Sequence, residues 1–325
     1  MATRNEFTEL FQKDMYGYFF ESYDQLPTVY DKIFDVKRSN TAFEKETVAV
    51  GMGALSELEE DAPIVYSNPI EGFTVSCKMR EFGDGFKLSA NFVADTPPEK
   101  ISNVVMELAG TWQEKVIQGK ETFAARFFNE GGFTAGSSVF NNSLGTLNND
   151  PSGNLCYDGK PFFNLTGNQR KAYAHTTTYY NGIASALSSD NLQTAYTLMT
   201  GTNNRDERGG KIALMPDVLV IPPALKFTAD SILNSTAIIS ASAEKGDKNV
   251  AEGLVKPIVW QYLTDADAWF LGKAKKGLVW YERQTPVIDV YIDDLTKAYH
   301  VDIRTRYGAV MKNWRYWVGS NFATS

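Results

Sequence analysis

Residues 72–99 read GFTVSCKMREFGDGFKLSANFVADTPPE, and this stretch decides the fold. Apolar and polar residues alternate on both sides of Gly83-Asp84-Gly85, a pattern typical of a two-stranded hairpin closed by a tight glycine turn. The expected apolar face consists of Phe73, Val75, Cys77, Met79, Phe86, Leu88, Ala90 and Phe92. A lone hairpin is marginal in water, so this face needs a cover.

A long helix is predicted directly after the hairpin. Thr96 as N-cap, prolines in the first turn and Glu99 at the third helical position form a capping box. Apolar residues then recur at helical spacings up to Gly131-Gly132, namely Ile101, Val104, Val105, Leu108, Trp112, Val116, Phe123 and Phe127. A helix over residues 97–130 would span roughly 45 Å. Two covers for the hairpin remain open: a neighbouring molecule, or an ordinary antiparallel sheet with the helix packed on it.

The composition favours a folded protein that does not bind nucleic acid through a basic surface. Of 325 residues, 43% are apolar and 22% charged, and the net charge is −7. Phosphate binding normally needs clustered Lys and Arg, and the longest basic group, Lys273 to Lys276, suggests a solvated turn. No apolar run reaches membrane-spanning length and no signal peptide is recognisable, so we expect a cytoplasmic protein with Cys77 and Cys156 as reduced thiols.

The rest of the chain predicts an arm and a mixed lobe. Residues 1–60 are rich in aromatics but weakly periodic, so they either pack over the main body or wrap a neighbour. A helix is expected after the N-cap group of residues 188–191, and an apolar strand over Val218 to Ile221, closed by a Pro-Pro pair that opens another helix. Further strands are predicted around residues 256–262, 269–271 and 278–283, and near the end of the chain.

Motifs for chemistry are missing from the sequence. His175 and His300 are far apart and lack ligand-spaced partners, and Gly209-Gly210-Lys211 lacks the rest of a phosphate loop. Acidic groups such as Glu59-Glu60-Asp61 and Asp293-Asp294 are best interpreted as solvated turns, since acid/base work needs carboxyls facing one pocket. We therefore expect no catalytic residue, no cofactor and no metal site, and an assembly component rather than an enzyme.

Several segments, taken in order, resemble the major capsid proteins of tailed bacteriophages, and among these the Mu-like major head subunit type. The segments are LPTVYDKIFDVKRSNTAFEKETVAVGMGAL (26–55), residues 72–99 quoted above, LMPDVLVIPPALKFTADSILNST (214–236), YLTDADAWFLG (262–272), VWYERQTPVID (279–289) and VDIRTRYGAVMKNWRYWVGSN (301–321). The resemblance rests on packing residues rather than on a catalytic signature.

The resemblance implies an α+β fold of the HK97-like capsid type. Its parts would be an N-terminal arm (1–59), an extended hairpin loop (60–95), a peripheral domain (96–184 and 286–325) with a spine helix over 97–130, and an axial domain (185–285). Residues expected to contact other subunits are Phe73, Val75, Met79, Phe82, Phe86, Leu88, Phe92, Tyr16, Phe19 and Phe20. Some relatives cross-link loop lysines; Lys78 and Lys87 are the candidates here, but exposed hairpin lysines usually protect an edge, so no cross-link is expected.

The implied function is a structural one. Copies would form pentamers and hexamers of an icosahedral shell around phage double-stranded DNA, without sequence readout, in the virion after assembly in the host bacterial cytoplasm. A portal protein, with scaffold or decoration proteins, would be the partners, and no membrane is involved. The alternatives are an encapsulin-type compartment or, from another class, a soluble carboxylate-dependent hydrolase in the α/β lobe.

Overall fold

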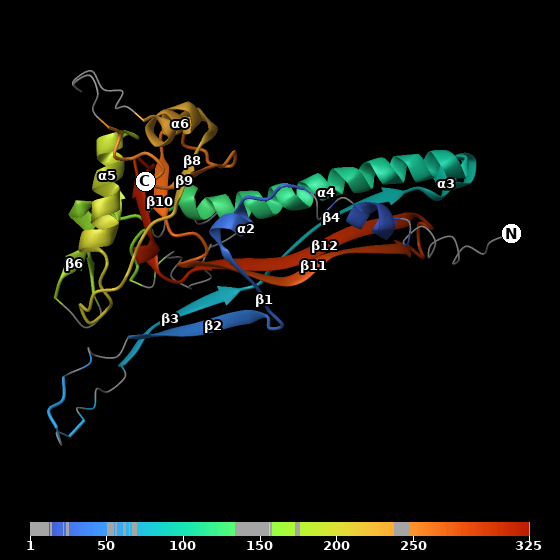
Figure 1. Ribbon diagram of the computed structural model, residues 1–325. Helices are drawn as coiled ribbons and strands as arrows, with labels where there is room; N and C mark the ends of the chain where they lie inside the picture. The colour runs from blue at the N-terminus through green and yellow to red at the C-terminus, as the bar shows by residue number, and fades with distance from the viewer. Residues whose placement is uncertain are drawn as a thin grey trace.

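The computed structural model describes residues 13, 15–21, 23, 26–50, 55, 57–60, 63, 64, 66, 70–133, 156, 158–172, 176–236 and 248–324. Figure 1 shows an elongated molecule with a compact lobe at one end, a long helix with a long sheet beneath it, and a two-stranded ribbon that projects away from both. This is the α+β composition that the resemblance implies.

A four-stranded sheet forms the long body of the molecule, in the order β1-β11-β12-β4. The strands are β1 (Asp35–Arg38), β11 (Leu278–Ile292), β12 (Tyr299–Met311) and β4 (Arg80–Leu88). The long helix α4 (Pro98–Asn129) covers one face, onto which Ile303, Thr305 and Tyr307 point. Alternation along β12, buried on one side and more exposed on the other, is the pattern of an antiparallel sheet with one solvated face.

The predicted hairpin is wrong. Residues Arg80 to Leu88 pair with β12, and the preceding strand β3 (Ile70–Lys78) pairs with the upstream strand β2 (Phe43–Val50). Gly83 and Gly85 lie inside β4 and neither has a positive φ. They allow close approach of the neighbouring strand, because a Cβ on Gly85 would lie 2.6 Å from the Asp302 carboxylate. The alternation of apolar and polar residues shows which face of a sheet each residue occupies, but it does not determine which strand is the pairing partner.

The predicted capping box is also wrong, although the helix itself is confirmed. Ser89 caps a short extra helix, α3 (Ala90–Asp95), by accepting from the Phe92 N–H at 3.1 Å, so Ala90 and Phe92 are helical. Thr96 ends α3, and α4 begins at Pro98 without a side-chain cap at Pro97. Proline needs no cap partner there, since its missing N–H would be unsatisfied in any first turn.

A second sheet forms the compact lobe, in the order β7-β13-β10-β8-β9. Its strands are β7 (Gly182–Ile183), β13 (Trp317–Ser320), β10 (Trp269–Gly272), β8 (Val218–Ile221) and β9 (Lys256–Val259). The helical elements beside it are α5 (Ser189–Thr197), η2 (Leu198–Thr202), η3 (Pro223–Leu225) and α6 (Lys226–Asn234). Ser188 caps α5 through the Asn191 N–H, and Pro223 opens the turn before α6, as the sequence predicts. The remaining short elements are η1 (Thr166–Asn168), η4 (Trp314–Tyr316) and the pair β5 (Arg170–Lys171) and β6 (Thr178–Tyr179).

The core runs through both sheets. The C-terminal half of α4 contributes Phe123, Phe127 and Phe128 to one continuous aromatic cluster with residues of both sheets. Five tryptophans are fully buried: Trp260, Trp269, Trp280, Trp314 and Trp317. A second cluster fills the lobe between its sheet and α5 and α6. Body and lobe therefore share packing rather than meeting through a linker.

The N-terminal segment packs over the main body of the same subunit. Met15 and Phe19 are buried against α4 and the β11–β12 strands. The Gln113 amide of α4 donates to the carbonyl oxygens of Tyr18 at 3.0 Å and Phe19 at 2.6 Å. Of the two arrangements left open for the arm, the described residues 15–21 and 23 adopt the one that covers their own chain. The apolar residues Phe7, Leu10 and Phe11, which precede this segment, lie outside the described residues.

Candidate intersubunit surfaces

The β2–β3 ribbon is anchored at its root and uncovered beyond it (Figure 1). Val75, Cys77 and Met79 pack on Val279, Tyr281 and Val310 of the body sheet. Gly308 of β12 makes this contact possible, because a Cβ there would lie 2.9 Å from the Cys77 sulfur and 3.0 Å from the Lys78 carbonyl oxygen. Burial raises the pKa of Cys77 to about 12, so this thiol acts as a small apolar group.

The far end of the ribbon presents large apolar side chains to solvent. Tyr66 is 87% exposed, Ile64 63% exposed, and Leu55 fully exposed. The connecting residues 51–69 contain four carboxylates and neither Lys nor Arg. Glu57, Glu59 and Glu60 are all exposed. A monomeric protein rarely leaves such a group of apolar side chains uncovered, so this end has the character of a contact surface.

A second exposed apolar surface lies at the opposite end of the body, where α3 meets the β11–β12 turn (Figure 1). Leu295 in the turn is 93% exposed, and Phe92 of α3 is 38% exposed. A groove of about 580 Å³ lies between these elements; its lining is Lys87, Leu88, Ser89, Phe92, Asp293, Thr296, Ala298 and His300.

The predicted contact residues fall into two groups. Met79 and Phe19 are buried inside their own subunit, and Val75, Phe82, Phe86, Leu88, Tyr16 and Phe20 are half-buried there. Phe82 stacks on Tyr307 with ring centroids 4.4 Å apart, and Phe86 packs on Trp112. Phe92 is exposed, while the Phe73 side chain lies outside the described part of the chain. The structure brings most of these residues to the α4 face of the subunit rather than to one open surface.

Sequence reasoning missed the buried carboxylate of Glu121, which joins three parts of the subunit. Its Oε1 accepts the backbone N–H of Val29 at 2.6 Å and of Tyr30 at 3.2 Å, and so caps helix α2 (Tyr30–Ile33). Its Oε2 accepts the ring N–H of Trp260 from the lobe at 2.6 Å. Burial raises the pKa of Glu121, while the three donors oppose the shift. A helical Glu normally indicates a solvated face, so the sequence carried no signal for this role.

The neighbouring Lys120 is also buried and points to the body sheet. Its ammonium lies 2.6 Å from the Glu282 carboxylate of β11 and over the rings of Tyr23 and Tyr307. Burial alone would lower the pKa of Lys120, but its surroundings, including this ion pair, raise it overall, so the side chain stays charged. Lys120 and Glu121 thus tie adjacent positions of α4 to different parts of the fold.

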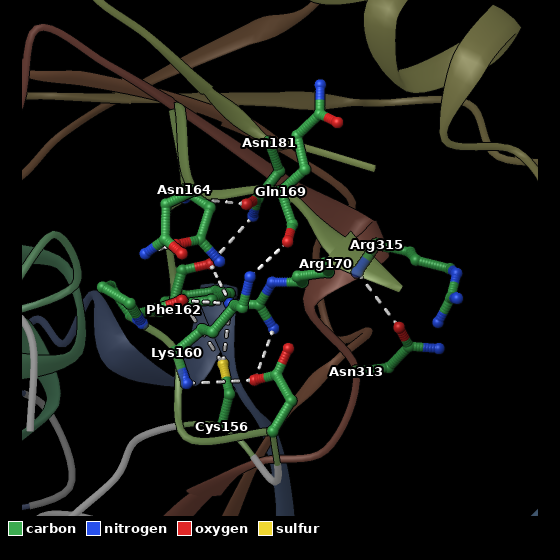
Figure 2. A network of polar contacts seen from close by, with 12 residues as sticks. Cys156, Lys160, Phe162, Asn164, Gln169, Arg170, Asn181, Asn313 and Arg315 are labelled. Carbon is green, nitrogen blue, oxygen red and sulfur yellow. Dashed lines mark hydrogen bonds and ion pairs between the residues drawn. The ribbon is translucent and has the colours of Figure 1, made fainter. Parts of the chain in front are cut away.

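A third polar cluster holds residues 156–181 against the C-terminal strand, as Figure 2 shows. The Arg170 guanidinium is fully buried and donates to the Cys156 sulfur at 3.1 Å and to the Phe162 carbonyl oxygen at 3.1 Å. The Asn181 amide donates to the carbonyl oxygens of Phe162 and Trp317, both at 3.0 Å. Beside it, Arg315 forms a buried ion pair with Glu207 at 2.6 Å. The buried Arg170, Asn181 and Arg315 side chains therefore connect the loop segments of this region to one another and to the C-terminal strand.

Nothing in the described ranges has the features of a reaction centre. Within them there is no cluster of three His, Cys, Asp or Glu side chains able to hold a metal ion, and no helix long and apolar enough to cross a membrane. A cavity of about 120 Å³ between α4 and β4 is lined by Phe82, Gly83, Asp84, Trp112, Lys115, Val116, Gly119, Ile303, Thr305 and Tyr307. Its one carboxylate, Asp84, already accepts the Trp112 ring N–H at 3.2 Å.

The family comparison agrees with this geometry. Residues 104–320 match the family model described as phage capsid protein, and the chain belongs to that family. It is a structural protein of the bacteriophage head and not an enzyme, and its place is the capsid of the virion. No curated protein matches the chain in sequence.

Solved structures support the same fold. The chain is similar to a chain of Mycobacterium phage Patience, with 11% identity and a TM-score of 0.54, covering 100% of this chain and 89% of that one. It is also similar to a capsid chain of an empty GTA particle computed with C5 symmetry, with 14% identity, a TM-score of 0.52 and 92% of each chain covered. Microbacterium phage Oxtober96 gives 10% identity, a TM-score of 0.51 and 92% of each chain. The HK97-like fold is therefore confirmed, while the Mu-like subtype stays a prediction.

Proposed function

We propose that copies of this chain assemble as pentamers and hexamers into an icosahedral shell that encloses phage double-stranded DNA. The observation that carries the proposal is the β2–β3 ribbon, which projects from the body with apolar side chains at its uncovered end. In a closed shell each ribbon would lie on a neighbouring subunit. Head-to-tail contacts of this kind form rings and shells when the rotation between successive subunits returns the chain of contacts to its starting point.

In this proposal residues 1–59 act as the arm and 60–95 as the extended loop. Residues 96–184 and 286–325 form the peripheral domain, and 185–285 the axial domain. The structure suggests one revision: the projecting ribbon is formed by β2 (Phe43–Val50) and β3 (Ile70–Lys78), whereas residues 80–88 belong to the body sheet. The contact role passes to residues that the subunit leaves exposed, such as Phe92, Tyr66 and Leu295.

The charge of the chain fits a container rather than a DNA-binding surface. A net charge of −7 favours holding packaged DNA without sequence readout. A portal protein, with scaffold or decoration proteins, would complete the particle, which would assemble in the host bacterial cytoplasm. We propose no lysine cross-link, since Lys78 and Lys87 lie on strands that pair with different partners.

Removing the ribbon tests the proposal. Residues 46–75 would be replaced by a short glycine-serine linker, which leaves β4 and the body sheet intact. We expect wild-type protein to form uniform shells in electron microscopy and the deletion variant to stay a soluble, folded subunit. Normal shells from the deletion variant would refute the role of the ribbon. Nuclease-protected double-stranded DNA inside wild-type particles separates a virus head from a compartment that holds cargo proteins.

A further inference from the structure

The end of the ribbon has a composition that defines what it can dock on. It is both apolar and acidic, with Glu57, Glu59 and Glu60 exposed beside Leu55 and Tyr66. Among the residues that the structure describes, none of the three carboxylates has an ion-pair partner. In Figure 1 this end projects away from the long sheet and from α4 of its own subunit. A positively charged surface would complement this end.

The subunit itself carries such a surface at the turn between β10 and β11. Lys275 and Lys276 are exposed in this turn, and the backbone N–H of Lys275 donates to the Ile33 carbonyl oxygen at 2.8 Å. That contact brings the exposed Lys32 of α2 to the same place. We name Lys32, Lys273, Lys275 and Lys276 the basic turn surface.

The nearby carboxylates only partly balance this surface. Asp217 pairs with Lys273 at 3.0 Å, and Asp31 is half-buried. No ion pair is formed by Lys32, Lys275 or Lys276 within the described ranges. By contrast, Lys226, an exposed lysine of α6, pairs with Asp230 at 3.0 Å. The basic turn surface therefore keeps an excess of positive charge.

The turn is held in place by hydrogen bonds to the lobe, which suits a docking platform. Asp217 accepts the Ala274 N–H at 2.7 Å, and the Trp317 ring N–H donates to the Lys276 carbonyl oxygen at 3.0 Å. Lys275 has a φ of 57°, a left-handed conformation that glycine would adopt without strain. Residues held in such a conformation are found most often at functional positions, and here the conformation directs an exposed lysine at the tip of the turn.

We propose that the acidic end of the ribbon, residues Glu57 to Glu60, docks on the basic turn surface of a second copy of this chain. The inference rests on the proposed shell and names the surface that each ribbon contacts. The carboxylates would face the Lys32, Lys275 and Lys276 ammonium groups, and Leu58 and Tyr66 would be covered in the same contact. Complementary charge of this kind fixes register and selects the correct neighbour.

Charge reversal on each side, alone and together, tests the inference. One variant carries Glu57→Lys, Glu59→Lys and Glu60→Lys; the other carries Lys275→Glu and Lys276→Glu. Each should lower the yield of sedimenting shells by about tenfold or more, because like charges then face each other. The combined variant should recover shells to within about threefold of wild type. A control with Lys248→Glu and Lys256→Glu makes the same change in net charge on exposed lobe lysines and should assemble normally.

The outcomes separate this inference from the proposed function. If wild-type protein forms no shells, the proposed function fails. If wild type forms shells and both reversal variants do so at wild-type yield, only the docking inference is overturned. Equal losses in the control and the lysine variant, or no recovery in the combined variant, would also overturn it. If the lysine variant forms normal shells that fail to retain DNA, the basic turn surface contacts nucleic acid instead. Circular dichroism of each unassembled subunit checks that the fold is retained.

Discussion

The carboxylate of Glu121 gives the sharpest test of how the subunit is held together. We predict that Glu121→Gln destabilises the subunit by about 3 kcal/mol, because the exchange sets two buried donors against each other and each unpaired buried donor costs about 1–3 kcal/mol. The new amide oxygen can still accept from Val29 and Tyr30, but its NH₂ group would face the Trp260 ring N–H, which lies 2.6 Å from the present acceptor. With about 2.1 cal/mol/K of unfolding entropy per residue, the Tm should fall by about 4 °C.

The assay is unfolding of unassembled subunits by urea and by heat. Glu114→Gln, an exposed position of the same helix, is the matched control and should change stability by less than about 0.5 kcal/mol. Trp260→Phe removes the opposing N–H, so the double variant with Glu121→Gln should cost less than the two single changes together, by about 1 kcal/mol. Additive effects, or equal stability of Glu121→Gln and the control, would refute the reasoning.

The pH dependence follows from the direction of the pKa shift. Burial raises the pKa of Glu121 above its ordinary value, so the folded state holds this proton more tightly than the unfolded chain does. The contribution of this group to stability is fully present below the unfolded pKa, about 4.3, and decreases as the pH rises through the folded pKa. The stability gap between wild type and Glu121→Gln should therefore narrow with rising pH. A gap that widens would contradict the assigned direction.

Three further predictions concern the packing of the subunit. Gly308→Ala should destabilise the subunit by about 1–3 kcal/mol in urea unfolding, because its Cβ would press on Cys77, and adding Cys77→Ala should recover part of the loss. Burial raises the pKa of both Cys77 and Cys156 to about 12. Iodoacetamide at pH 8 should therefore label neither thiol until the subunit unfolds. Rapid labelling of the folded subunit would contradict the burial of these thiols. Arg315→Met should lower the free energy of unfolding by about 3–5 kcal/mol, because it removes the buried partner of Glu207. A loss below about 1 kcal/mol would show that this ion pair does not stabilise the subunit.

Local sequence signals, such as apolar spacing, N-caps and prolines, correctly predicted the helices in which they occur. The apolar spacing before Gly131-Gly132 placed the long helix, found at Pro98–Asn129, and the serine cap and proline pair placed α5 and the start of α6. These signals act within a few residues, so no tertiary information is needed.

Strand pairing could not be predicted in the same way. β4 pairs with residues more than two hundred positions further along, and alternation within residues 72–92 is compatible with either partner. The glycines that suggested a turn are explained by the close approach of β12, with Ile303 and Arg304 beside Gly83 and Asp302 beside Gly85, and this approach is visible only once β12 is in place. The buried ions Lys120, Glu121 and Arg170 were missed because a charged residue indicates a solvated face until its partners are known.

The continuity of β3 and β4 has a mechanical consequence. The two strands are joined only at Met79 and run in nearly one line, so tension on the ribbon passes straight into the body sheet (Figure 1). Ladder hydrogen bonds stand perpendicular to the strands, and a pull along β4 therefore shears its nine residue pairs with β12 together instead of opening them one at a time. A neighbouring subunit that pulls on the ribbon therefore loads all of these hydrogen bonds at once, which is the direction in which the sheet resists force best.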